Sequence, residues 1–253
     1  MPPMLYRTAW KGPVTSSLVV EAFRKGLGGS TPLANPSQPG VGDALQILKT
    51  QDGINREDIW LQTKFTPIDG QDPTKPLPYD PQAALTDQVH QSLATSLREL
   101  RTPYLDALIL HSPMTTRAQH EQVWTAFEGA VRQGKNRWYA DVSYGRDILQ
   151  LCKKYNARFQ SFWTLTGNPR LLTHPSLSHL ASVYRSCSPE AALYELLIRR
   201  LGMTPLNGTT GEAHMDEAVN LLQKMERREE VTGDGAEQAE KAEKAVFELL
   251  YPG

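Results

Sequence analysis

Cysteine is nearly absent from this sequence, and so are long apolar runs and any excess of charge of one sign. The 253 residues include two cysteines, Cys152 and Cys187, without CxxC spacing, so neither a disulfide framework nor a structural zinc site is predicted. No apolar run approaches the roughly 18 residues that a membrane span needs. With 27 Lys and Arg against 28 Asp and Glu, the formal net charge is -1, which gives no footprint for nucleic acid.

The amino-terminal segment MPPMLYRTAWKGP lacks the apolar stretch of a signal peptide, so we expect a cytoplasmic protein with no membrane partner. A content of 40% hydrophobic and 22% charged residues is ordinary for a globular protein. Because an α/β barrel commonly fills about 250 residues, we expect one domain over residues 1–253. Within it, residues 224–253 form a charged helical tail, of which 224–244 predict a solvated face. The oligomeric state stays open.

Short β-type runs alternate with longer amphipathic helices, which is the pattern of a parallel sheet covered by helices. The fold class that this pattern predicts is α/β and TIM-barrel-like, (β/α)8 in type but incomplete, with about six legible strands. We expect the strands near residues 5–9, 59–65, 105–110, 137–142, 159–165 and 203–206. We expect helices near residues 16–25, 41–50, 80–100, 118–132, 148–155 and 188–201, and from 212 onward. Residues 26–40 hold four glycines and three prolines, which predicts a loop and makes a strand improbable.

Two polar residues stand at the ends of apolar strands. Lys64 is near the end of 59–65, and His111 follows 105–110 directly. In a parallel barrel the carboxyl ends of the strands open into one mouth, where functional groups gather. Taken singly, such a lysine is more often a surface residue with a buried stem, and such a histidine a hydrogen-bonded core group.

Together with their neighbours, these two strands resemble those of the aldo-keto reductase family. Leu61-Gln62-Thr63-Lys64-Phe65 is similar to the strand with the family's active-site lysine, and the run from Leu105 to Pro113 is similar to the strand that ends in its active-site histidine. The resemblance extends over most of residues 4–220. It is also carried by Gly42-Asp43-Ala44-Leu45, Trp124-Thr125-Ala126-Phe127-Glu128, Gly134-Lys135 and the run from Pro205 to His214.

The resemblance implies a reductase that converts a small aldehyde or ketone to an alcohol, with NADP(H) as cofactor and NAD(H) as the alternative. Lys64 and His111 would be catalytic, and Trp10 would line the substrate pocket. The residues that would hold the cofactor are Ser161, Phe162, Trp163, Thr164, Gly208, Thr209, Thr210, His214 and Glu217. A Gly/Thr turn that opens a helix also offers N–H donors and a positive dipole end to a phosphate, although such turns are common after strands. We expect Lys64, His111 and this turn to face one cavity.

Several family features have no counterpart here. The family's catalytic aspartate and tyrosine should stand in residues 26–40, which contain neither, and Arg7 replaces a glycine of the first strand. Two of the eight family strands, including the one after Gly134-Lys135, are absent or rebuilt, and His214 replaces an arginine. A positioned general acid contributes roughly 10²–10⁴-fold to a rate. In the family, the tyrosine is this general acid. Tyr139 or Tyr144 could take its place here, although tyrosines near strand ends are usually packing residues.

Three interpretations therefore stay open. The chain is a working or weakened reductase, a non-catalytic descendant that binds a nucleotide or a partner, or an incomplete gene product. The substrate cannot be predicted from the sequence, because specificity in this fold depends on loop side chains.

Overall fold

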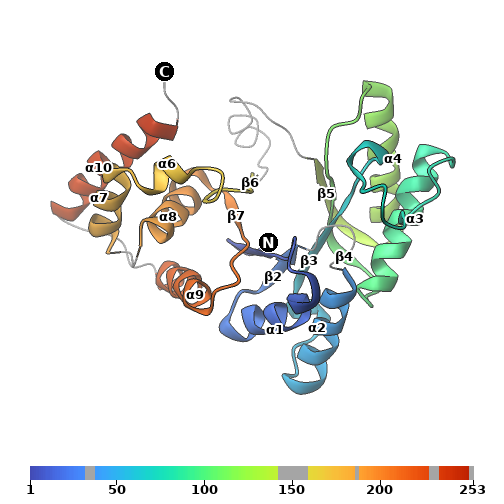
Figure 1. Cartoon of the computed structure of the whole chain (residues 1–253), viewed down its shortest axis with the longest axis horizontal. Helices are drawn as coiled ribbons and strands as arrows, with labels where there is room; N and C mark the ends of the chain where they lie inside the picture. The colour runs from blue at the N-terminus through green and yellow to red at the C-terminus, as the bar shows by residue number, and fades with distance from the viewer. Residues whose placement is uncertain (32–37, 142–158, 186–187, 228–233, 251–253) are drawn as a thin grey trace. The chain divides into compact units, whose positions relative to one another are not determined.

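The protein is described by a computed structural model that covers residues 1–31, 38–141, 159–185, 188–227 and 234–250. Its chain divides into two compact units (Figure 1). The first comprises Met1–Pro2 and Tyr6–Ile148, and the second comprises Pro3–Leu5 and Leu149–Gly253. That the whole chain is one domain stays a prediction.

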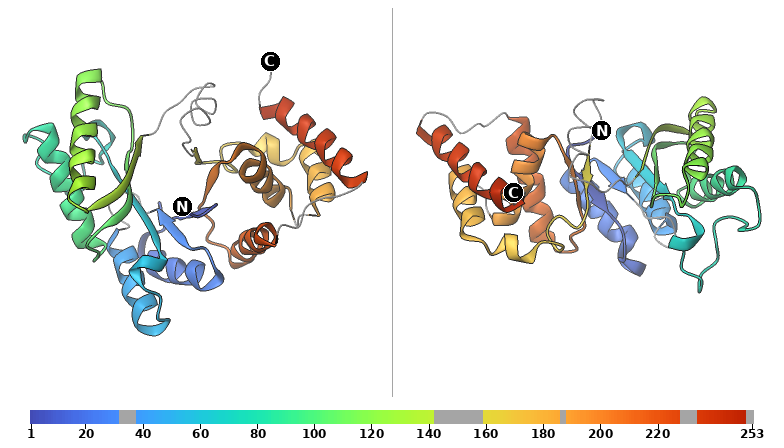
Figure 2. Two further views of the ribbon diagram at one scale, coloured as in Figure 1. Left: turned by 180° about the vertical axis from the view of Figure 1, so that it is seen from behind. Right: turned by 90° about the horizontal axis from the view of Figure 1, so that it is seen from above.

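The first unit alternates strands and helices from its start to its end. All its strand pairs are parallel, in the order β5-β4-β3-β2-β1, so each strand lies beside the next one in sequence. Helices α1 to α4 lie on one side of these strands (Figures 1 and 2). Successive β-α-β crossovers with neighbouring strands are the building plan of a barrel wall, which confirms the predicted fold class. Its elements are β1 (Leu5–Arg7), η1 (Gly12–Val14), α1 (Thr15–Lys25), β2 (Gly29–Thr31), α2 (Gln38–Gln51), η2 (Arg56–Asp58), β3 (Trp60–Phe65), η3 (Ile68–Gly70), α3 (Leu85–Glu99), β4 (Leu105–Leu110), α4 (Arg117–Arg132) and β5 (Asn136–Asp141).

The two faces of this sheet differ in character. Tyr6 and Leu61 share one face, because both are in register with Ser30 of β2. Alternation along β3 then places Thr63 on that same face, where Gln38 of α2 donates a hydrogen bond to its hydroxyl at 2.7 Å. The helices therefore cover this face, and its strand residues are buried: Tyr6, Leu61, Thr63, Phe65, Leu108 and Leu110. The opposite face carries Arg7, Gln62, Lys64, Ala107 and Ile109.

Strand β2 corrects the prediction that residues 26–40 contain no strand. Gly29 pairs with Trp60, and Ser30 pairs with both Tyr6 and Leu61, so β2 lies between β1 and β3. The prediction was wrong because ladder hydrogen bonds from neighbours on both sides override the low strand propensity of a glycine-rich segment. The loop prediction also extended too far, since α2 already begins at Gln38.

Helix α3 begins at Leu85, whereas the sequence predicted a helix from about residue 80. The Asp80 carboxylate accepts from the N–H of Gln82 at 2.9 Å, and the Asp80 carbonyl accepts from the N–H of Ala83 at 3.2 Å. An aspartate that bonds to the backbone two residues on forms a turn in competition with a helix. Asp80 therefore begins a turn, and the helix starts only after it.

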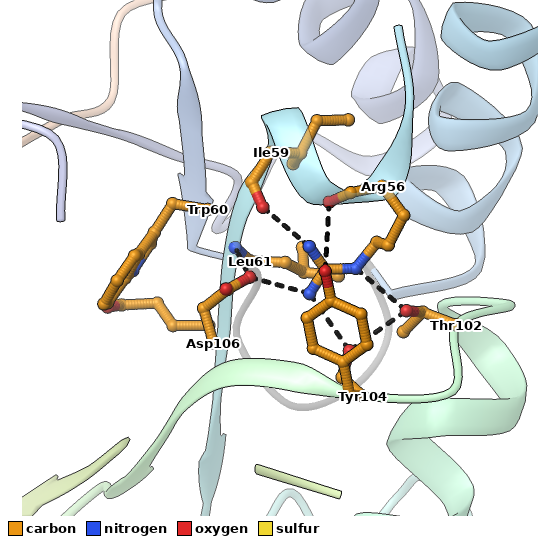
Figure 3. Close-up of polar contacts among 8 residues, drawn as sticks. Arg56, Ile59, Trp60, Leu61, Thr102, Tyr104 and Asp106 are labelled. Atoms are coloured by element: carbon orange, nitrogen blue, oxygen red, sulfur yellow. Dashed lines mark hydrogen bonds and ion pairs between the residues drawn. The ribbon is translucent and has the colours of Figure 1, made fainter. Parts of the chain in front are cut away.

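A half-buried arginine ties β3 to β4 at their amino-terminal ends (Figure 3). The Arg56 guanidinium donates to Thr102 Oγ1 at 2.9 Å, to the carbonyls of Ile59 and Tyr104 at 2.6 and 3.0 Å, and to Asp106 Oδ2 at 2.7 Å. The same carboxylate oxygen accepts from the N–H of Leu61 at 2.9 Å. Asp106 is only 3% exposed, so its charge depends on this network for compensation.

The second unit pairs two short parallel strands and packs its helices into a separate apolar core. Its elements are β6 (Gln160–Ser161), α6 (Pro169–Leu172), α7 (Pro175–Tyr184), α8 (Pro189–Leu201), β7 (Thr204–Asn207), α9 (Glu212–Glu226) and α10 (Asp234–Leu250). The predicted start of α8 is confirmed, because Ser188 Oγ accepts from the N–H of Ala191 at 3.1 Å. The core joins α7, α8 and α10 through residues that include Leu177, Leu180, Leu193, Leu196, Ala242 and Val246.

The carboxyl-terminal helix has the solvated charged face that was predicted, with Glu237 and Lys241 exposed, and also a buried face that was not. Helix α10 lies along α7 (Figures 1 and 2) and buries Ala239, Ala242 and Val246. Glu243 is also buried, where it accepts from the Tyr184 hydroxyl at 2.7 Å and pairs with Arg200 at 2.8 Å. The alanines form a narrow apolar stripe along a highly charged helix, and the charge pattern alone did not predict that this stripe is buried.

The strand predicted over 159–165 is reduced to Gln160–Ser161. Trp163 adopts a positive φ of 53°, and its carbonyl accepts from the N–H of Gly167 at 2.8 Å, so the chain turns there. With β2 added, the described residues contain seven strands, one more than expected. The helix predicted over 148–155, both cysteines and Tyr144 lie outside the described residues.

Candidate active site

Lys64 and His111 stand side by side at the carboxyl ends of β3 and β4. Lys64 pairs in register with Ile109, and the His111 N–H donates to the Phe65 carbonyl at 2.9 Å, which continues the ladder beyond β4. Since residues at even spacing share one face of a strand, both side chains lie on the face opposite the helices. The structure thus brings these two predicted catalytic residues together.

Thr66 orients the histidine ring. Its hydroxyl lies 2.9 Å from Nδ1 of His111, and the threonine is buried. The Thr66 carbonyl accepts from the Tyr79 hydroxyl and from Gln71 Nε2, each at 2.8 Å, so both residues of the following loop fix it in place. Sequence reasoning missed Thr66, although a hydroxyl directly after the strand that carries Lys64 was a usable signal.

Arg7 brings a further positive charge to the same face. It ends β1, and its guanidinium carbon lies 4.4 Å from the centroid of the Trp10 ring. Trp10 is 77% exposed and has a positive φ of 59°. Lys11 follows, buried, with Nζ 4.9 Å from the centroid of the Tyr6 ring. Trp10, which was predicted to line the substrate pocket, therefore lies against Arg7. The sequence analysis had noted Arg7 only as the replacement of a family glycine.

Burial and neighbouring positive charges lower the pKa values of this group of residues. Burial, and then the charge of Arg7, lowers the pKa of Lys64 to about 8 and that of Lys11 to about 8. Burial, followed by Lys64 and Arg7, lowers the pKa of His111 to about 4. His111 is therefore uncharged at neutral pH, whereas Lys64 is mostly protonated but readily loses its proton.

The predicted phosphate turn belongs to the second unit. The Thr209 N–H donates to Asn207 Oδ1 at 2.9 Å, and the Gly211 N–H donates to Thr209 Oγ1 at 3.1 Å, which shapes the turn before α9. Gly211 caps α9 without a side-chain hydrogen bond. The predicted ligands here are exposed or half-buried: Gly208, Thr209, Thr210, His214 and Glu217.

The other predicted cofactor residues lie on the turn after β6. Thr164 is buried and donates to Ser161 Oγ at 3.0 Å, whereas Phe162 and Trp163 are 40% and 53% exposed. These residues and the Gly208 turn belong to the second unit, and Lys64 and His111 belong to the first. Their common cavity stays a prediction, as does a proton-donor role for Tyr139, which pairs with Leu108 in the ladder.

Comparison with known proteins places this geometry in a family. The model of the Aldo/keto reductase family matches residues 35–165. An aldo/keto reductase from Brucella melitensis is 18% identical with a TM-score of 0.73, covering 98% of this chain and 95% of its own. An aldose reductase from Schistosoma japonicum is 15% identical with a TM-score of 0.73, covering 97% of this chain and 88% of its own.

A Bombyx mori aldo-keto reductase, solved in complex with NADP, is 16% identical with a TM-score of 0.72, covering 96% of this chain and 89% of its own. Likeness at such low identity shows the fold. The family match is a separate finding: it spans more than half of the chain and includes both Lys64 and His111. On these grounds, the chain belongs to the aldo/keto reductase family.

Proposed function

We propose that this chain is an NADP(H)-dependent oxidoreductase that reduces an aldehyde or a ketone to an alcohol. The observation that carries the proposal is the placement of Lys64 and His111 on one face at adjacent strand ends, with Thr66 orienting the histidine at 2.9 Å. A neutral hydrogen-bond donor and a labile ammonium group are the two groups that a carbonyl oxygen needs as it gains negative charge.

His111 would polarise the carbonyl. With its pKa lowered to about 4, the ring is neutral at physiological pH and has one donor nitrogen. When the Thr66 hydroxyl donates to Nδ1, the ring proton lies on Nε2, which is the nitrogen left to bond to the substrate oxygen. A neutral imidazole fixed in this tautomer is a known way to polarise a carbonyl.

Lys64 would supply the proton that the family takes from a tyrosine. General acids work best when their pKa lies near the working pH, and the Lys64 pKa is lowered to about 8. As the carbonyl becomes an alkoxide, Nζ of Lys64 gives it a proton and becomes a neutral amine, which solvent then reprotonates. This arrangement needs neither the aspartate nor the tyrosine that residues 26–40 lack.

The second unit has donors that fit the cofactor's phosphate. Gly211 leaves the first-turn N–H groups of α9 without a side-chain cap, and Thr210 and His214 are exposed beside them. Glu212, in the first turn, opposes an anion, so we expect modest affinity. Ser161, Phe162 and Trp163 would contact the rest of the dinucleotide. When bound, the nicotinamide supplies the hydride.

The substrate would be a small carbonyl compound.

None of the helices that the structure describes combines the length and apolar character that a membrane crossing requires. In the same described parts of the chain, no group of three or more His, Cys, Asp or Glu side chains is gathered as a metal site needs.

The test is consumption of NADPH with aromatic aldehydes by the wild type, by Lys64→Met and by Lys49→Met, which changes an exposed lysine of α2. We expect Lys64→Met to lower kcat by roughly 10²–10⁴-fold, with Lys49→Met unchanged. Binding of NADPH is followed separately by quenching of tryptophan fluorescence. Quenching without turnover would favour a non-catalytic nucleotide-binding protein, and absence of both would refute the proposal.

A further inference from the structure

Three cationic or basic side chains from three strands share one face of the first unit. Arg7 lies on the face opposite Tyr6, and therefore on the face that carries Lys64, because Tyr6 and Leu61 are both in register with Ser30. Lys64 in turn pairs with Ile109, two residues before His111. All three residues stand at the carboxyl ends of their strands, at one edge of the sheet.

No acid compensates this cluster among the side chains that the structure describes, which do not include those of β5. No carboxylate there forms an ion pair with Arg7, Lys64 or His111. Burial is the main cause of the lowered pKa of Lys64 and of His111, and the charge of Arg7 adds to it at both residues. Partly buried cations that repel one another cost free energy, and a bound anion removes that cost.

The setting of Arg7 favours a planar anion. Its guanidinium carbon lies over the Trp10 ring, 4.4 Å from the ring centroid, and the guanidinium is planar, with its N–H donors in a fixed fork. Two parallel N–H groups match the two oxygens of a carboxylate. The contact with Trp10 thus restrains a side chain whose paired N–H groups suit bidentate binding.

We propose, on the basis of the reductase function above, that the substrate is a small oxo acid, whose carboxylate pairs with Arg7 while its carbonyl oxygen lies at His111 and Lys64. Arg7 would then be the residue that determines specificity. Its anionic ligand would be the substrate, and not the phosphate of the cofactor.

The first experiment compares an acid with its neutral ester. Reduction of 2-oxobutanoate and of methyl 2-oxobutanoate is measured for the wild type, Arg7→Met, Arg7→Lys and Arg117→Met, the last at an exposed position on α4. We expect Arg7→Met to raise KM for the acid by about 10- to 100-fold, as loss of a charged hydrogen-bonded pair predicts. KM for the ester stays unchanged, Arg7→Lys recovers part of the loss, and Arg117→Met behaves as the wild type.

The second experiment reports binding without turnover. Trp10 touches Arg7, so 2-oxobutanoate added without cofactor should change the fluorescence of the wild type and not that of Trp10→Phe. The change should be lost in Arg7→Met and weakened in Arg7→Lys, with NADPH affinity preserved in both. This signal in a protein without turnover would uphold the anion site and refute the reductase function.

Three results would overturn the oxo-acid proposal. The first is an equal rise in KM for acid and ester in Arg7→Met. The second is an absence of any Trp10 signal with the acid in the wild type. The third is a loss of NADPH affinity in Arg7→Met with binding of the acid intact, which would assign Arg7 to the cofactor.

Discussion

Replacement of Arg56 by methionine tests the network between β3 and β4. The guanidinium makes four hydrogen bonds there, and its removal leaves the Asp106 carboxylate, only 3% exposed, without that cation. Breaking a buried ion pair from one side costs about 3–5 kcal/mol, because a charge stays buried without its compensation. We therefore expect Arg56→Met to lower the free energy of unfolding by about that amount.

Equilibrium unfolding in urea, followed by tryptophan fluorescence and far-UV circular dichroism, measures this cost. The matched control is Arg117→Met, because Arg117 also pairs with an acid, Glu121, but the two side chains are 92% and 64% exposed. An exposed pair contributes about 0–1 kcal/mol. The double variant Arg56→Met/Asp106→Leu should cost less than the sum of its single changes, since it leaves no buried charge.

The reasoning would be refuted by a cost below about 1 kcal/mol for Arg56→Met, equal to that of the exposed control. It would also fail if the two single changes simply added, because the charges would then not be coupled.

Three further outcomes follow from the structure of the first unit. A Cβ added at Gly42 of α2 would lie 2.2 Å from the Glu99 carbonyl oxygen, so Gly42→Ala should lower the free energy of unfolding by about 1–3 kcal/mol. The control is Gly129→Ala, because a Cβ there meets open space. In the same urea titration this change should stabilise the fold by up to about 1 kcal/mol. The pKa of His111 is lowered from 6.5 to about 4 in the folded state, so between these pH values the folded state binds fewer protons than the unfolded state. The contribution of His111 to stability should therefore fall as the pH drops through that range. The same pH dependence of stability in His111→Asn would contradict this. Thr66→Val should lower kcat by roughly 10-fold with KM little changed, since it removes the bond that orients His111; a change in KM alone would assign Thr66 to substrate binding.

Elements with strong local signals were predicted closely. Strand β4 was predicted to the residue, because an apolar run that only Asp106 interrupts, and that is buried on both faces, has no other stable place in an α/β fold. The start of α8 was predicted because Ser188 is a favoured cap residue, and the start of α9 was predicted because a Gly/Thr loop ends just before Glu212. These signals are local, so the sequence around them is sufficient.

Other elements depended on distant partners. Strand β2 exists because β1 and β3 pair with it on both sides, and no property of Gly29 to Thr31 alone predicts that pairing. Helix α10 buries an alanine stripe because α7 lies against it, and its charge pattern alone indicated solvent.

For the candidate site, the amino-acid sequence was enough to single out Lys64 and His111, since each stands at or near the end of an apolar strand and in a motif that resembles one of the family. Only the tertiary structure placed Arg7 on their face and Thr66 at the histidine ring. The reason is that the alternation of side chains along one strand follows from the local sequence, whereas the register between β1, β2 and β3 arises only when separate segments pair. That register also brings together the charges that set the protonation of the site.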